Sequence, residues 1–128
     1  MEISTLMQRL DEVVQTLHTQ YPALAQLEFH ARHAELEAER FEAMIFCKIK
    51  LESGTDAHTR QRVAADEEVF KHKMAHLTAQ ATYKAAHGSL KALECEYGSL
   101  RSQIGFERSL LDQQVDFPVQ IQKRHKED

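Results

Sequence analysis

Apolar residues recur at alternating three- and four-residue steps in two parts of the chain. The first run is Leu24, Leu27, Ala31, Ala34, Ala38, Phe41 and Ile45, and the second is Ala86, Leu90, Leu93, Tyr97, Leu100 and Ile104. This stepping collects apolar side chains on one stripe of a helix and is typical of a coiled coil. We therefore predict an all-α fold in which two long helices pack as an antiparallel hairpin.

Turn and capping residues divide the predicted hairpin into three helices, at about residues 4–20, 22–52 and 56–115. Ser4 is a residue type that caps helix N-termini. Pro22 disfavours helical geometry at Tyr21, so we expect a kink or short corner there. Gly54 can take the left-handed conformation that ends a helix, and we expect the hairpin tip at this glycine, with Thr55 or Asp56 capping the next helix.

The same signals predict the domain organisation. We expect one helical domain over residues 1–115, in which the N-terminal helix continues the bundle beyond the corner at Pro22. The apolar pattern fails after Val115, and we expect a flexible C-terminal tail over residues 116–128.

The stepping in the first part of the third helix differs from the stepping further along. It runs through Phe70, Met74, Leu77 and Ala81, and it slips before the second run begins. Folding about Gly54 sets residues whose numbers sum to roughly 108 to 110 opposite one another, which brings Gly88 across from Pro22. The alanine-rich stretch at the slip fits either a close approach of the two arms or an apolar strip for a partner.

Composition and charge narrow the functional classes. Hydrophobic residues make up 42% and charged residues 28% of the 128 positions, which fits one soluble domain. The net charge of −4 argues against a protein whose main role is to coat a phosphate backbone. The sequence has no apolar stretch near the roughly 20 residues of a membrane span and no signal-peptide pattern, so we expect a cytoplasmic protein without membrane contact.

The sequence also carries little that would support catalysis. It contains no Gly-x-Ser-x-Gly elbow and no glycine-rich phosphate loop. Cys47 and Cys95 lie on different predicted helices, and we expect both to be free thiols in the core or at its edge. We therefore expect no enzyme activity, no catalytic residues and no cofactor.

Eight histidines make a metal site the first constellation to consider. His30, His33 and Glu37 lie on the second predicted helix, and the hairpin brings His72 and His76 to about the same height. The predicted stripes put His33, His72 and His76 on the side or back of their helices. We therefore expect solvated histidines and no metal ligands, with a metal-binding bundle as the third interpretation.

Cations near the predicted tip raise the alternative of nucleic-acid binding. Lys48, Lys50, Arg60 and Arg62 gather there, although acidic neighbours nearly cancel their charge. The alternative function is a direct DNA-binding accessory protein of recombination that uses this tip together with the basic tail, Lys123–Lys126.

A second group of candidate contact residues flanks the later apolar run. Arg101 and Arg108 lie beside it, and Gly98, Ser102 and Gly105 form a smooth strip suited to another helix. A glycine inside a helix costs about 1 kcal/mol relative to alanine, so Gly105 requires a reason. Docking of a partner and close packing within the chain are the two alternatives.

The leading hypothesis is a non-enzymatic helical module that binds another protein, of unknown identity, and that self-associates. The hydrophobic residues exceed what one hairpin stripe consumes, which favours a dimer or larger bundle. The residues in excess are Ile3, Leu6, Ile49, Leu51, Val63, Leu110, Leu111, Phe117, Val119 and Ile121.

Three segments between Glu28 and Ser109 resemble small all-helical proteins of tailed bacteriophages that are encoded near early recombination and annealing genes. The segments are the Ala/Glu-rich helix Ala31–Arg40, the turn with Gly54, Thr55 and Arg60, and the stretch with Tyr83, Lys84, Lys91, Ala92, Leu93 and Leu100–Ser102. The resemblance implies a phage setting, the host cytoplasm and an accessory role near DNA metabolism. It implies no catalytic residues. The leading hypothesis accordingly takes a phage or host DNA-processing factor or complex as the partner, on which the module acts as an accessory or as an inhibitor.

Overall fold

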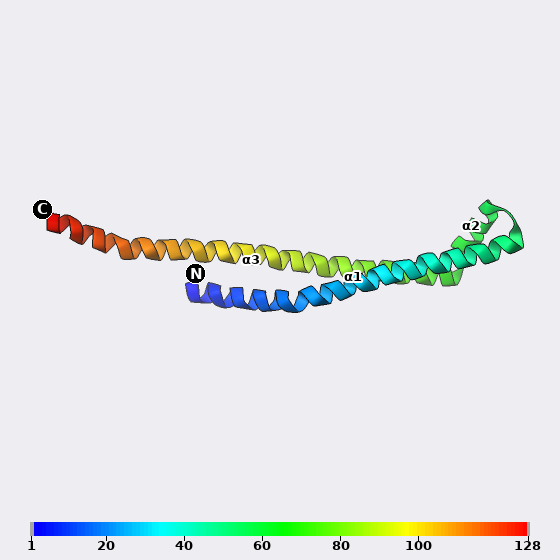
Figure 1. Cartoon of the computed structure of the whole chain (residues 1–128), viewed down its shortest axis with the longest axis horizontal. Coiled ribbons are helices and arrows are strands. Elements are labelled where there is room, and N and C mark those ends of the chain that lie inside the picture. The colour runs from blue at the N-terminus through cyan, green and yellow to red at the C-terminus, as the bar shows by residue number, and fades with distance from the viewer. Residues whose placement is uncertain (1, 128) are drawn as a thin grey trace. The chain divides into compact units, whose positions relative to one another are not determined.

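The computed structural model describes the backbone of residues 2–127 and the side chains of residues 2–52 and 54–114. The described chain forms three helices, α1 (Ile3–Ser53), α2 (Asp56–Ala65) and α3 (Glu67–Glu127). The long helices α1 and α3 pack antiparallel, and the short α2 connects them (Figure 1). The predicted all-α helical hairpin is therefore confirmed. None of the described helices is long and apolar enough to cross a membrane.

The turn after α1 lies where the sequence predicts it. Gly54 has a φ of +79°, the left-handed conformation that favours glycine. Its N–H donates to the carbonyl of Lys50 at 3.1 Å and closes the last turn of α1. Thr55 is the N-cap residue of α2, although its side chain makes no capping hydrogen bond.

The predicted single helix over residues 56–115 is wrong, because Asp66 separates α2 from α3. Asp66 has extended backbone, with a ψ of 126°, and its Oδ1 accepts a hydrogen bond from the N–H of Val69 at 3.0 Å. Glu67 and Glu68 then supply negative charge to the first turn of α3, where the helix dipole favours it. Aspartate followed by two glutamates is the sequence signal for this start.

α3 ends at Glu127, beyond the predicted end at residue 115. The side chains of residues 115–128 lie outside the described ones, so the flexible tail and its basic residues remain a prediction.

The predicted division of the first arm into helices over residues 4–20 and 22–52 is wrong, because α1 continues through Pro22. The helix bounds do not test the predicted kink, which stays a prediction. Buried or half-buried positions before and after it keep the same stepping, through Leu17, Gln20 and Leu24. Pro22 itself is exposed, so water can serve the helix carbonyl that loses its N–H partner. The helix therefore continues past the proline without ending there.

The described structure divides into two compact units. The terminal unit comprises Met1–Thr19 and Leu90–Asp128, and the tip unit comprises Gln20–Ser89. The buried apolar residues of the terminal unit include Leu6, Val13, Leu17, Leu90, Leu100 and Ile104. Those of the tip unit include Ala31, Ala38, Ile49, Val63 and Val69. Each unit thus has apolar residues from both arms in its core.

α3 packs through a different stripe from the predicted one. Phe70, Met74, Leu77 and Ala81 are exposed, which contradicts the predicted inner face. The inner positions are Val69, His72, His76, Ala79, Tyr83 and Ala86, followed by the correctly predicted run from Leu90 to Ile104. These positions alternate three- and four-residue steps throughout, so the predicted slip between Ala81 and Ala86 is absent from α3.

Two histidines therefore lie on the inner face, where the sequence analysis did not expect them. The ring of His72 is 4.5 Å from the ring of Phe41, measured between centroids. His76 is half-buried, and its Nδ1 is buried without a hydrogen-bond partner. The prediction that both histidines lie on the side or back of α3 is wrong.

The same contacts correct the predicted register. Phe41 lies beside His72, and Glu42 forms an ion pair with Lys73 at 3.3 Å between Oε1 and Nζ. A simple fold about Gly54 would set Phe41 opposite the start of α3. The separate helix α2 and the break at Asp66 account for the shift.

We expect His76→Leu to raise the free energy of unfolding by about 1 kcal/mol, because the buried ring nitrogen lacks a partner and leucine suits this position. His18→Leu, at an exposed position on α1, is the matched control and should change it by less than about 0.5 kcal/mol. Urea unfolding followed by circular dichroism measures both. Equal effects of the two substitutions would contradict the assigned inner face.

Candidate protein-binding surface

Two of the four candidate cations at the tip form ion pairs within the chain. The Nζ of Lys50 lies 2.7 Å from Oδ1 of Asp56, and Nη2 of Arg62 lies 3.5 Å from Oε2 of Glu52. The hydrogen bond from Lys50, followed by its charge, lowers the pKa of the Asp56 carboxyl. Lys48 and Arg60 are exposed. Pairing with carboxylates reduces what the tip offers to a phosphate backbone.

The terminal unit brings the other two candidate residues together. Arg101 and Arg108 lie one heptad apart on α3, and both are exposed. Between them is an open depression of about 310 Å³, whose other lining residues are Met7, Leu10, Ile104 and Gly105. The guanidinium of Arg101 also lies over the ring of Tyr97, 5.7 Å from its centroid. We call this feature the arginine depression.

Gly105 belongs to this depression because it leaves space that no other part of the described chain fills. A Cβ atom at Gly98 or Gly105 would meet no atom within 4 Å. Close packing within the chain therefore does not explain either glycine. Docking of a partner helix on the small-residue strip stays a prediction.

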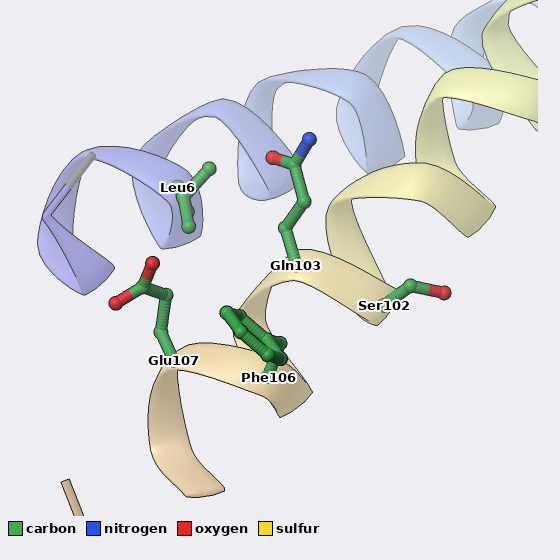
Figure 2. Close-up of a pocket in the computed structure, with 5 residues that line it drawn as sticks. All are labelled: Leu6, Ser102, Gln103, Phe106 and Glu107. Carbon is green, nitrogen blue, oxygen red and sulfur yellow. The ribbon is translucent and has the colours of Figure 1, made fainter. Parts of the chain in front are cut away.

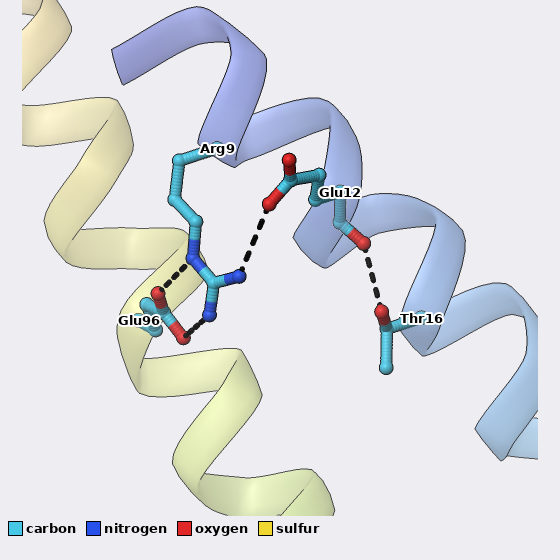
Figure 3. A network of polar contacts seen from close by, with 4 residues as sticks. All are labelled: Arg9, Glu12, Thr16 and Glu96. Carbon is cyan, nitrogen blue, oxygen red and sulfur yellow. Dashed lines mark hydrogen bonds and ion pairs between the residues drawn. The ribbon is translucent and has the colours of Figure 1, made fainter. Parts of the chain in front are cut away.

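An ion pair between exposed side chains links α1 and α3 in the terminal unit (Figure 3). The Nε and Nη2 atoms of Arg9 on α1 lie 2.6 Å and 3.0 Å from the two carboxylate oxygens of Glu96 on α3. Arg9 also reaches Glu12 at 3.3 Å, and the Thr16 hydroxyl donates to the Glu12 carbonyl at 2.8 Å. The bidentate geometry fixes the register of α1 against α3 in this unit.

A second depression in the terminal unit has a volume of about 430 Å³. Its lining residues are Leu6, Ser102, Gln103, Phe106 and Glu107. Figure 2 shows Leu6 of α1 facing the side chains of Gln103, Phe106 and Glu107 of α3. Phe106 is exposed, so this depression has an apolar rim but no cation like those of the arginine depression.

The predicted excess of hydrophobic residues is correct only in part. Leu6, Ile49 and Val63 are buried, and the last two form one cluster with Val69 at the tip. Ile3 is half-buried, whereas Leu51, Leu110 and Leu111 are exposed. Phe117, Val119 and Ile121 lie outside the described side chains.

The histidines and cysteines stand apart from one another. Among the described side chains, no group of three His, Cys, Asp or Glu residues gathers to hold a metal ion. His30 and His33 lie near the ring of Phe29, at 6.3 Å and 6.2 Å between centroids. Cys47 and Cys95 are free, as predicted, but both are exposed and neither is a core residue.

Sequence reasoning found the arginines and Gly105 but missed Met7 and Leu10, which complete the depression from α1. They were missed because the predicted alignment of the two arms was wrong. That alignment set Arg9 opposite Ser99–Arg101, whereas the structure sets it opposite Glu96. Charge complementarity between Arg9 and Glu96 is the signal that would have found the register.

Comparison of the chain with protein-family models, with curated proteins and with solved structures gave no match.

We expect the Glu96 carboxyl to titrate below an ordinary glutamate, because the Arg9 hydrogen bonds, more than its charge, lower the Glu96 pKa. Since this pKa is lowered on folding, the stabilising contribution is present above the unfolded pKa of about 4.3 and is lost as pH falls through the folded pKa. Carboxyl NMR titration of wild type and Arg9→Ala measures it. An unchanged Glu96 titration in Arg9→Ala would show that the ion pair is absent in solution.

Proposed function

We propose that the chain is a non-enzymatic module that binds another protein. A helix of the partner docks into the arginine depression of this chain. The observation that carries the proposal is an open depression in which Leu10 and Ile104 line the surface together with two arginines that lie one heptad apart. A helix in an apolar groove is a recurring mode of protein recognition. Two guanidinium groups add directional contacts to carboxylates.

The residues that line the depression support a partner helix with apolar and acidic side chains. An apolar side chain of the docked helix would cover Leu10 and Ile104, and acidic side chains seven residues apart would reach Arg101 and Arg108. Gly105 allows the partner's helix to approach α3 closely. An open groove of this kind does not exclude water from a reaction, which favours binding over catalysis.

The resemblance to small helical phage proteins supports a choice among partners. On that basis we propose a DNA-processing factor or complex as the partner, with the chain acting as an accessory or an inhibitor in the host cytoplasm. The alternative, direct DNA binding, rests on the tip cations, two of which are paired with carboxylates.

Affinity capture from a bacterial lysate, with and without nuclease treatment, tests the proposal. Wild type should retain one stoichiometric protein, and R101E/R108E should retain it about 100-fold less, because each reversal replaces a charged hydrogen bond by repulsion. The control R32E/R40E changes the net charge equally at exposed positions on α1 in the tip unit and should retain the protein.

Other outcomes of the capture would contradict this assignment. Equal retention by R101E/R108E would exclude the arginine depression. Recovery of nuclease-sensitive material alone, lost in R60E/R62E and at high salt, would favour direct DNA binding. Gly105→Ala provides a second test: it should reduce retention, whereas Gly88→Ala, at another glycine of α3 with open space around it, should not.

A further inference from the structure

The tip unit presents a second apolar stripe, on the side of α3 that faces away from α1. Phe70 is 60% exposed, Met74 45% and Leu77 54%, and Ala81 is exposed as well. Their steps of four, three and four residues are those of a coiled-coil stripe. We call these four residues the outer stripe. All four side chains are exposed, so no described residue of the chain covers this stripe.

Charged residues of opposite sign end the outer stripe. Glu67 lies three residues before Phe70, and Lys84 lies three residues after Ala81, so both continue the same stepping. Both side chains are exposed. Among the ion pairs of the described residues, neither Glu67 nor Lys84 takes part. The stripe therefore has a free carboxylate at one end and a free ammonium group at the other.

We propose that the outer stripe pairs with the outer stripe of a second copy of this chain, antiparallel about a two-fold axis. In this arrangement Glu67 of each copy meets Lys84 of the other, and Phe70 meets Ala81. Met74 and Leu77 meet across the centre. The pattern is thus complementary to itself in charge at its ends and in side-chain size along its length, as an isologous interface requires.

The flanking residues are compatible with this arrangement. Lys71 and Lys73 lie beside the stripe, and each has an acidic partner in its own chain, Glu68 at 3.2 Å and Glu42 at 3.3 Å. Across the antiparallel interface they approach the uncharged Thr78 and Gln80 of the second copy. A parallel pairing would instead set Glu67 against Glu67 and Lys84 against Lys84, which like-charge repulsion disfavours.

The length of the contact sets the expected affinity. From Glu67 to Lys84 the helix extends about 26 Å at 1.5 Å per residue. A contact of this length is small among protein interfaces, so we expect a dissociation constant on the order of 10 µM. The arginine depression lies outside the stripe, so the dimer and the proposed partner do not compete for the same residues.

Sedimentation equilibrium of the full chain between about 1 and 200 µM tests the dimer. Wild type should dimerise, and M74K/L77K should raise the dissociation constant by about 100-fold, because each charge is introduced twice in a symmetric interface. L36K/M44K is the control: both residues are exposed on α1, 59% and 57%, and the dissociation constant should change less than about threefold. Circular dichroism confirms that all variants stay helical.

Charge exchange tests the antiparallel arrangement. E67K and K84E should each raise the dissociation constant by about tenfold, and E67K/K84E should return it to within about threefold of wild type, because the exchange restores both opposite-charge pairs. A wild-type monomer at 200 µM, or a dimer that M74K/L77K preserves, would overturn the proposal. A double variant no tighter than the single ones would overturn the antiparallel pairing.

Discussion

The structure depends on the phase of α3, that is, on which of its residues face α1 and which face away within each compact unit. From Val69 to Ile104 the inner positions keep three- and four-residue steps without interruption. The same phase turns Phe70, Met74 and Leu77 outward and sets Arg101 and Arg108 beside the inner stripe. Both proposed binding surfaces therefore follow from it.

The start of α3 sets that phase. Asp66 ends α2 and caps α3 through the N–H of Val69, so the first inner residue lies immediately after the cap. Val69 then joins Ile49 of α1 and Val63 of α2 in the apolar cluster at the tip. A half-buried histidine at position 76 is the cost of this choice, since its Nδ1 has no partner. The larger apolar side chains remain available for contacts outside the chain.

The sequence predicted the hairpin, the turn at Gly54 and the inner runs on both arms where bulky or small apolar residues dominate. The sequence-based prediction failed where a local sequence pattern disagreed with the packing between the helices. Pro22 predicted the end of a helix, but α1 continues through it because the proline is exposed to water. Phe70, Met74 and Leu77 predicted the inner face of α3, but the structure places other residues there, His72 and His76 among them. The sequence identified Arg101 and Arg108 of the candidate surface. It did not identify Met7 and Leu10, because finding them requires the correct register between α1 and α3.

The phase of α3 is tested most directly by nuclear Overhauser contacts from the ring of Phe41 in the wild-type protein. The structure sets the Phe41 and His72 rings 4.5 Å apart between centroids, so their ring protons should show strong cross-peaks. Phe70 and Met74 face away from α1 and should show none to Phe41. Cross-peaks from Phe41 to Phe70 or Met74, with none to His72, would show that α3 packs through the other stripe and would contradict the account.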